Sequence, residues 1–126
     1  MKRVIAALAF IAFSVITSLY SYFSINKRTD ALLASAHTAA NAAESSNIEE
    51  YPLTAAQLNE KWEESQGLFH VFLDHALCED VELGVKQIQL YAKSGDTAEM
   101  LDSCYECIAA LEHVRESQRI SPENIF

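Results

Sequence analysis

Two cysteines three residues apart, Cys104 and Cys107, are the residues of this chain whose types and spacing most clearly could do chemistry. Cys78 is the third and last cysteine. Together with His75 and His113 they supply thiol and imidazole groups, which bind zinc when four of them converge in a tetrahedron. Cys104 and Cys107 could also form a redox couple, and Cys78 could form a disulfide with either of them.

The same two cysteines belong to a series of residues that recur at steps of four, three, four and three: Met100, Cys104, Cys107, Leu111 and Val114. This spacing is that of one face of an amphipathic helix. A cysteine on such a face behaves as a small apolar residue. The pattern therefore favours buried free thiols over a metal or redox site.

Register along the chain also argues against a site built from all three cysteines. If Gly95 ends one helix and turns the chain into the next, Cys107 lies level with about residue 84 and Cys104 with about residue 87. Cys78 then lies roughly 9 to 13 Å farther along the axis, whereas a disulfide needs Cα atoms within about 7 Å. We therefore expect no metal and no cofactor. An odd number of cysteines leaves at least one unpaired unless it links two chains.

The histidines support two further hypotheses. The hairpin at Gly95 places His113 near Cys78 and His75, which makes these three residues the candidate site for a small ligand or a metal. His70 and Asp74 are expected one turn apart on a helix, where they could do acid–base work. Because no nucleophile, phosphate-binding glycine loop or oxyanion site accompanies them, we expect a hydrogen-bonded histidine and no enzyme.

Charge is distributed unevenly along the chain. Four of the nine basic residues flank the first apolar run: Lys2, Arg3, Lys27 and Arg28. From Thr29 onward five basic residues stand against eighteen acidic ones, a formal net charge of −13. Such a surface repels phosphate backbones, so we expect no nucleic-acid partner. The acidic pairs lack the spacing and the glycine of a calcium loop.

Val4 to Ile25 is an uncharged run of 22 residues, long enough as a helix to cross a bilayer. Tyr20 and Tyr22 near its end suit the headgroup region. A cleaved signal peptide is the alternative, but the small residues of a cleavage site appear only at residues 34–36, beyond two positive charges. We therefore expect an uncleaved anchor.

The remaining sequence predicts an all-α fold, in which the membrane helix extends into a small antiparallel bundle of three to four helices. Thr54 to Gln57 has the form of a capping box, so a second helix is expected to begin there, with Pro52 keeping Tyr51 out of it. A third helix is expected from about Asp80 to about Ser94. A fourth, capped by Asp96 to Glu99, is expected from Thr97 to about Glu116.

Each expected helix has an apolar face. Alanines at helical spacing in residues 29–46 indicate that another helix packs closely on that segment. Residues 67–77 are apolar on all sides, which predicts a central position. Ile125 and Phe126 are expected to fold back onto the bundle. The apolar positions expected in the second and third helices are Leu58, Trp62, Phe69, Leu73, Ala76, Val81, Val85, Ile88 and Ala92.

Several short motifs together resemble one known family: Glu60 to Glu63, Phe72 to His75, Glu79 to Leu83, Leu90-Tyr91 and Ser121 to Phe126. They are similar to the small clostridial-type membrane proteins of domain-of-unknown-function family 4363. The resemblance covers nearly the whole chain and implies a single-pass topology in a bacterial cell membrane. That family has no established activity, so the resemblance leaves the function open.

These observations predict four segments. Residues 1–3 form a cytoplasmic head, 4–25 the transmembrane helix, 26–52 an Ala-rich stalk and linker, and 53–126 an acidic extracytoplasmic bundle. The basic residues on the two flanks are nearly balanced, and the amino group favours a cytoplasmic amino terminus. We expect a noncatalytic accessory protein that binds another membrane or envelope protein, with a homo-oligomer as a compatible arrangement. The ligand-binding module at His75, Cys78 and His113 is the alternative.

Overall fold

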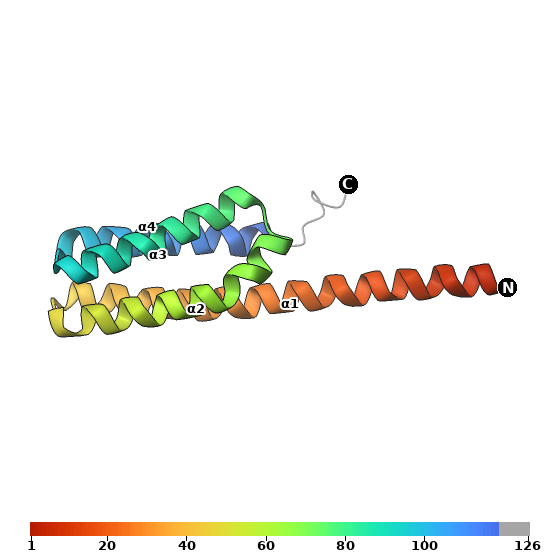
Figure 1. Ribbon diagram of the computed structural model, residues 1–126, viewed down its shortest axis with the longest axis horizontal. Coiled ribbons are helices and arrows are strands. Elements are labelled where there is room, and N and C mark those ends of the chain that lie inside the picture. Colours follow the sequence, from red (N-terminus) through yellow and green to blue (C-terminus); the bar gives the residue numbers. More distant parts are fainter. Residues whose placement is uncertain (119–126) are drawn as a thin grey trace.

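A computed structural model describes residues 1–118 of the chain, which are almost entirely helical and contain no strand. The elements follow in the order α1 (Lys2–Glu44), η1 (Ile48–Glu50), α2 (Tyr51–Phe72), α3 (His75–Ser94) and α4 (Thr97–Ser117). Successive helices run antiparallel, and α4 returns to pack on α1, which closes an up-down-up-down bundle (Figure 1). The predicted all-α bundle with an extended first helix is confirmed.

Helix α1 has two different halves. Residues 1–20 are exposed throughout and project beyond the bundle; we call them the uncovered segment (Figure 1). From Ser21 onward α1 presents a regular face to α2 and α4, and most of that face consists of small side chains. The close helix packing predicted from the alanines is confirmed. Residues 26–44, expected as part of a stalk, instead supply the first helix of the bundle.

The start of α2 differs from the prediction. Tyr51 is helical (φ −55°, ψ −52°), and Pro52 occupies the first turn, where its missing N–H costs no hydrogen bond. The Thr54 hydroxyl donates to the carbonyls of Glu50 and Tyr51 (3.0 and 3.1 Å), so it does not cap the helix. Full burial of Tyr51, whose hydroxyl lies 2.9 Å from Thr97 Oγ1, stabilises this earlier start.

The turn between α2 and α3 was also predicted wrongly. Helix α2 ends at Phe72, Leu73 is extended, and Asp74 caps α3 by accepting a hydrogen bond from the Ala76 amide (3.4 Å). The third helix thus begins about one and a half turns before the acidic residues expected to start it. The expected all-round burial of residues 67–77 is wrong, because Val71, Phe72 and Ala76 are exposed.

The hairpin between α3 and α4 agrees with the prediction. Gly95 ends α3 in the left-handed conformation (φ 76°), which glycine adopts without steric cost. Asp96 caps α4 by accepting from the Glu99 amide (3.2 Å). The whole predicted face of α4 is fully buried: Met100, Cys104, Cys107, Leu111 and Val114. The predicted fold-back of Ile125 and Phe126 lies outside the described residues.

Candidate functional site

Cys107 of α4 lies at a close approach between α3 and α4. A Cβ atom added to Gly84 would meet the Cβ of Cys107 at 2.9 Å and its Sγ at 3.3 Å. Cys107 is therefore level with residue 84, as the hairpin at Gly95 predicts. Cys78, Cys104 and Cys107 are all free and fully buried.

Burial keeps these thiols protonated. It raises the pKa of Cys104 and of Cys107 to about 12, with a smaller contribution to the latter from Cys104. Burial, followed by the negative charges of Asp74 and Glu82, also raises the pKa of Cys78. Because the thiolate is the form that attacks disulfides and binds metals, these are structural rather than reactive cysteines.

The structure does not bring the candidate ligands His75, Cys78 and His113 together. His75 lies at the start of α3 and pairs with Glu79 on the surface (Nε2 to Oε1 2.8 Å). Cys78 is directed into the core, whereas His113 lines a surface groove of about 220 Å³ between α3 and α4, beside Asp80. In residues 1–118 no three His, Cys, Asp or Glu side chains are arranged to hold a metal ion.

His70 and Asp74 do not share a helix, contrary to the prediction. His70 lies in the last turn of α2 and Asp74 caps α3. The His70 ring is instead close to two other rings, with centroid distances of 6.4 Å to Trp62 and 6.0 Å to His75. His70 thus contacts aromatic rings, and the expected pair of His70 with Asp74 is not formed.

Trp62 lies in the core, as the helical spacing of the apolar residues predicts. The same spacing gives no information about the indole N–H. The Trp62 ring is almost fully buried and packs edge-to-face on Phe69 (centroids 5.7 Å apart). Its Nε1–H has no hydrogen-bond partner among the described residues. An unpaired buried donor costs free energy, so large apolar contact must hold this ring in place.

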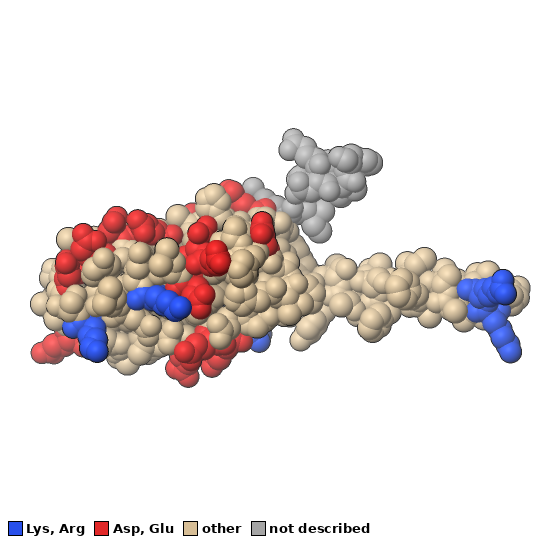
Figure 2. Space-filling model, turned by 45° about the horizontal axis from the view of Figure 1, so that its top comes forward, with Lys and Arg blue, Asp and Glu red and all other residues tan. Residues whose placement is uncertain are grey.

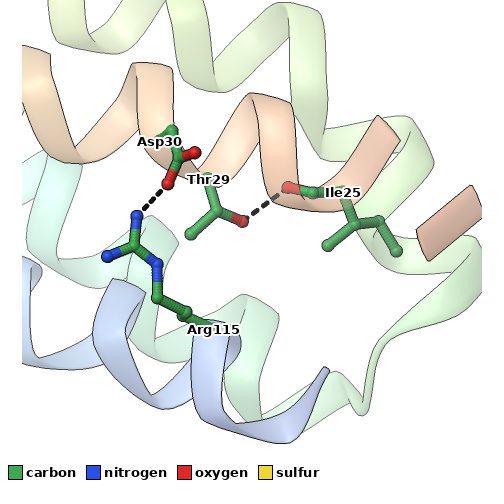
Figure 3. A network of polar contacts seen from close by, with 4 residues as sticks. All are labelled: Ile25, Thr29, Asp30 and Arg115. Carbon is green, nitrogen blue, oxygen red and sulfur yellow. Dashed lines mark hydrogen bonds and ion pairs between the residues drawn. The ribbon is translucent and has the colours of Figure 1, made fainter. Parts of the chain in front are cut away.

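Polar contacts at two positions along α1 connect it to α4. Arg115 of α4 points toward Asp30 of α1 and forms an ion pair with it (Figure 3). The preceding residue, Thr29, is buried, and its hydroxyl donates to the Ile25 carbonyl at 2.7 Å. Near the far end of α1, Tyr105 donates to the Glu44 carboxylate, and this hydrogen bond raises the pKa of Tyr105. These contacts connect the inner half of α1 with α4.

The surface charge of the bundle differs from that of the uncovered segment. Acidic side chains form several patches on the visible face of the bundle, whereas the charged side chains of the uncovered segment are Lys2 and Arg3 at its tip (Figure 2). Among the described residues, α1 is the one helix long and apolar enough to cross a membrane, and only 6% of its most apolar stretch is buried. The core helix of a soluble protein would be mostly covered.

Together these features define a small four-helix bundle protein whose first helix continues as a bare apolar rod. The chain belongs to the family described as Domain of unknown function (DUF4363), whose model matches residues 19–125. This confirms the resemblance found in the sequence. The match begins at the end of the uncovered segment, so it covers the bundle. Comparisons with curated proteins and with solved structures gave no significant match.

Proposed function

We propose that this chain is a noncatalytic accessory protein held in a bacterial cell membrane by α1. Its acidic bundle lies outside the cell and binds another membrane or envelope protein. The observation that carries the proposal is the continuity of α1, which is bare and apolar over residues 1–20 and part of the bundle core from Ser21. A bilayer is the environment that stabilises such a bare apolar helix.

The buried half of α1 also supports a retained anchor. A signal peptidase acting at the small residues 34–36 would remove Ile25, Thr29, Leu32 and Leu33, all of them buried, from the bundle. The mature product would lose much of the helix that α2 and α4 pack against. An uncleaved α1 keeps the core complete.

The proposed orientation rests on charge. Lys2, Arg3 and the amino group outnumber Lys27 and Arg28 by one positive charge, which favours a cytoplasmic amino terminus. A membrane potential that is positive outside further favours an acidic domain on that side.

The charge of the bundle surface supports the proposed binding role. Most of the charged groups that the bundle exposes are carboxylates, and its buried cysteines are protonated. A surface of this kind suits a partner with a basic face, because complementary charge raises the rate of association and excludes acidic competitors.

Membrane extraction and labelling test the anchor. Full-length protein should stay in the pellet after carbonate washing, and a Leu90→Cys variant should react with an impermeant thiol reagent added to intact cells. Release by carbonate, or a mature amino terminus beyond Ile25, would contradict anchoring. Loss of labelling in intact cells but not in lysed cells would reverse the orientation.

Affinity purification at native expression tests the accessory role. A second membrane or envelope protein should co-purify from mild detergent and be released by raised salt, since charge pairs at an exposed interface are screened. Recovery of the chain alone would count against the role. Recovery of copies of itself would favour the homo-oligomer instead.

A further inference from the structure

The corner between α2 and α3 exposes two large apolar side chains in succession. Val71 is 73% exposed and Phe72 is 44% exposed, and they are the last two residues of α2. Figure 1 shows this corner at the end of the bundle from which the uncovered segment of α1 emerges. The two side chains therefore lie beside the apolar rod and away from the far end of the bundle.

Contacts between α1 and α2 show which residues of α1 lie beside the corner. Arg28 donates from Nη1 to the Glu64 carbonyl (3.1 Å), so these two positions are nearly level. Because the helices are antiparallel, the eight residues from Glu64 to Phe72 bring Phe72 level with about residue 20 of α1. Consistently, Phe72 and Ser21 line one groove of about 440 Å³, which continues along α1.

The length of the apolar run relates this position to a bilayer. A hydrocarbon core of roughly 30 Å is crossed by about 20 helical residues. A span that starts at Val4 then ends near Phe23. Phe72, beside Ser21, consequently lies within the last turn of the span, and Val71 lies at the same boundary.

Charge changes along α2 at the same place. After Glu64, α2 carries no Asp, Glu, Lys or Arg, and His70 is its one titratable side chain before the corner. Along α2 the acidic surface, which anionic headgroups would repel, thus stops about two turns before Val71 and resumes on the α3 side of the corner at Asp74. Lys27 and Arg28 of α1 lie near this height, where cations suit lipid phosphates.

Most hydroxyls of the groove beneath Phe72 are hydrogen-bonded within α1. Of the four in its lining, three donate to carbonyls about one turn earlier: Ser14 to Phe10, Thr17 to Phe13 and Ser21 to Ser18, each at 2.9 Å. The remaining lining is largely the rings of Phe10, Phe13 and Phe72. Acyl chains match such a surface without losing hydrogen bonds.

We propose that Val71 and Phe72 insert into the lipid bilayer and form a second membrane contact beside α1, with acyl chains in the groove below Phe72. This inference rests on the proposed anchoring by α1. Two contacts with one leaflet restrict the tilt of the bundle, so the protein presents its acidic surface to a partner at a fixed height.

Three variants test the proposal, each with one cysteine added at an exposed position. Phe10→Cys, Val71→Cys and Leu90→Cys replace side chains that are 72%, 73% and 61% exposed. Each is labelled with a small bimane fluorophore on full-length protein, where the native thiols are buried, and reconstituted into phosphatidylcholine vesicles with and without brominated acyl chains. Unchanged helical circular dichroism confirms that each variant is folded.

Brominated lipid should quench the probes at residues 10 and 71 and leave the probe at residue 90 almost unquenched. Bromine near the headgroup should quench residue 71 more than bromine deep in the acyl chain. Quenching of the probe at residue 10 without quenching of the probe at residue 71 would contradict the membrane contact at the corner and leave the anchoring by α1 intact. Absence of quenching at residue 10 would contradict both the anchoring and the corner contact. Disulfide cross-linking of unlabelled Val71→Cys into a dimer at low protein-to-lipid ratio would assign the corner to a second copy of the chain.

Discussion

Gly84 of α3 lies so close to Cys107 of α4 that a Cβ atom on the glycine would come within 2.9 Å of the cysteine Cβ. The same added atom would lie 3.1 Å from the Cys107 Cα, which is backbone and cannot turn away. The two helices can adopt this spacing because one residue has no side chain and the other has a small one. This contact, together with the turn at Gly95, sets the register of the α3–α4 hairpin.

Gly84→Ala should therefore lower the free energy of unfolding by about 1–3 kcal/mol, the usual cost of forcing a methyl group into a packed core. Chemical denaturation of the detergent-solubilised chain, followed by circular dichroism, measures the change. Gly67→Ala is the matched control, since nothing lies within 4 Å of its Cβ position. That change should be neutral or stabilise the helix by up to about 1 kcal/mol.

The double variant Gly84→Ala/Cys107→Gly moves the missing side chain to the other helix and should recover part of the lost stability. Cys107→Ala should not rescue Gly84→Ala, because alanine keeps the Cβ that causes the overlap. Equal rescue by both would show that the sulfur atom, and not the Cβ, limits the helix spacing.

Periodicity was sufficient to predict the buried face of α4 and the register of its cysteines, because regular helix geometry relates spacing directly to position. Helix starts were harder to predict. Thr54 matches a capping box, yet burial of Tyr51 and the tolerance of a first turn for Pro52 begin α2 earlier. Asp74 is a residue type that often caps a helix, but the apolar residues on both sides of it resemble a continuous helix, so the turn between α2 and α3 was not predicted there.

Functional features followed less directly from the sequence. His75 and His113 were predicted to be near Cys78, but a histidine's direction depends on its exact position around the helix, and both histidines are exposed. The sequence predicts a central position for Val71 and Phe72, because an apolar run has the same composition whether it packs inside a core or lies at the surface. In the structure both side chains are exposed.

The buried thiols predict a loss of stability at alkaline pH. The folded pKa of Cys104 and Cys107 is about 12, whereas an unfolded thiol titrates near 9. The unfolded chain therefore releases protons first as pH rises, and stability that is complete below pH ~9 is lost toward pH ~12. From pH 8 to 10 the free energy of unfolding should fall by about 1 kcal/mol per thiol.

Denaturation curves at pH 8 and pH 10 measure this effect. The variant Cys104→Ala/Cys107→Ala provides the control, because it removes both titrating groups and keeps small apolar side chains at their positions. Its stability should depend less steeply on pH than that of the parent chain. Identical slopes for the two proteins would show that the thiols are not the groups responsible.

The burial of Trp62 predicts that two substitutions at this position lower the stability by different amounts. Trp62→Ala should cost about 3–5 kcal/mol, because it leaves a cavity beside Phe69. Trp62→Phe should cost clearly less, since it keeps an aromatic ring there and removes an N–H that has no partner among residues 1–118. Denaturation midpoints of the two variants measure the difference. Equal losses would indicate that the indole nitrogen makes a stabilising hydrogen bond.

Two truncations test the division of α1. Removing residues 1–20 deletes only exposed side chains, whereas removing residues 1–36 also deletes buried ones, including Ile25, Thr29 and Leu32. We expect the shorter truncation to give a folded, water-soluble bundle with a cooperative thermal transition. The longer truncation should lack that transition, because α2 and α4 lose much of the helix they pack against. A shorter truncation that unfolds would mean that the uncovered segment supports the bundle, and a longer one that stays folded would mean that the remaining helices form a sufficient core alone.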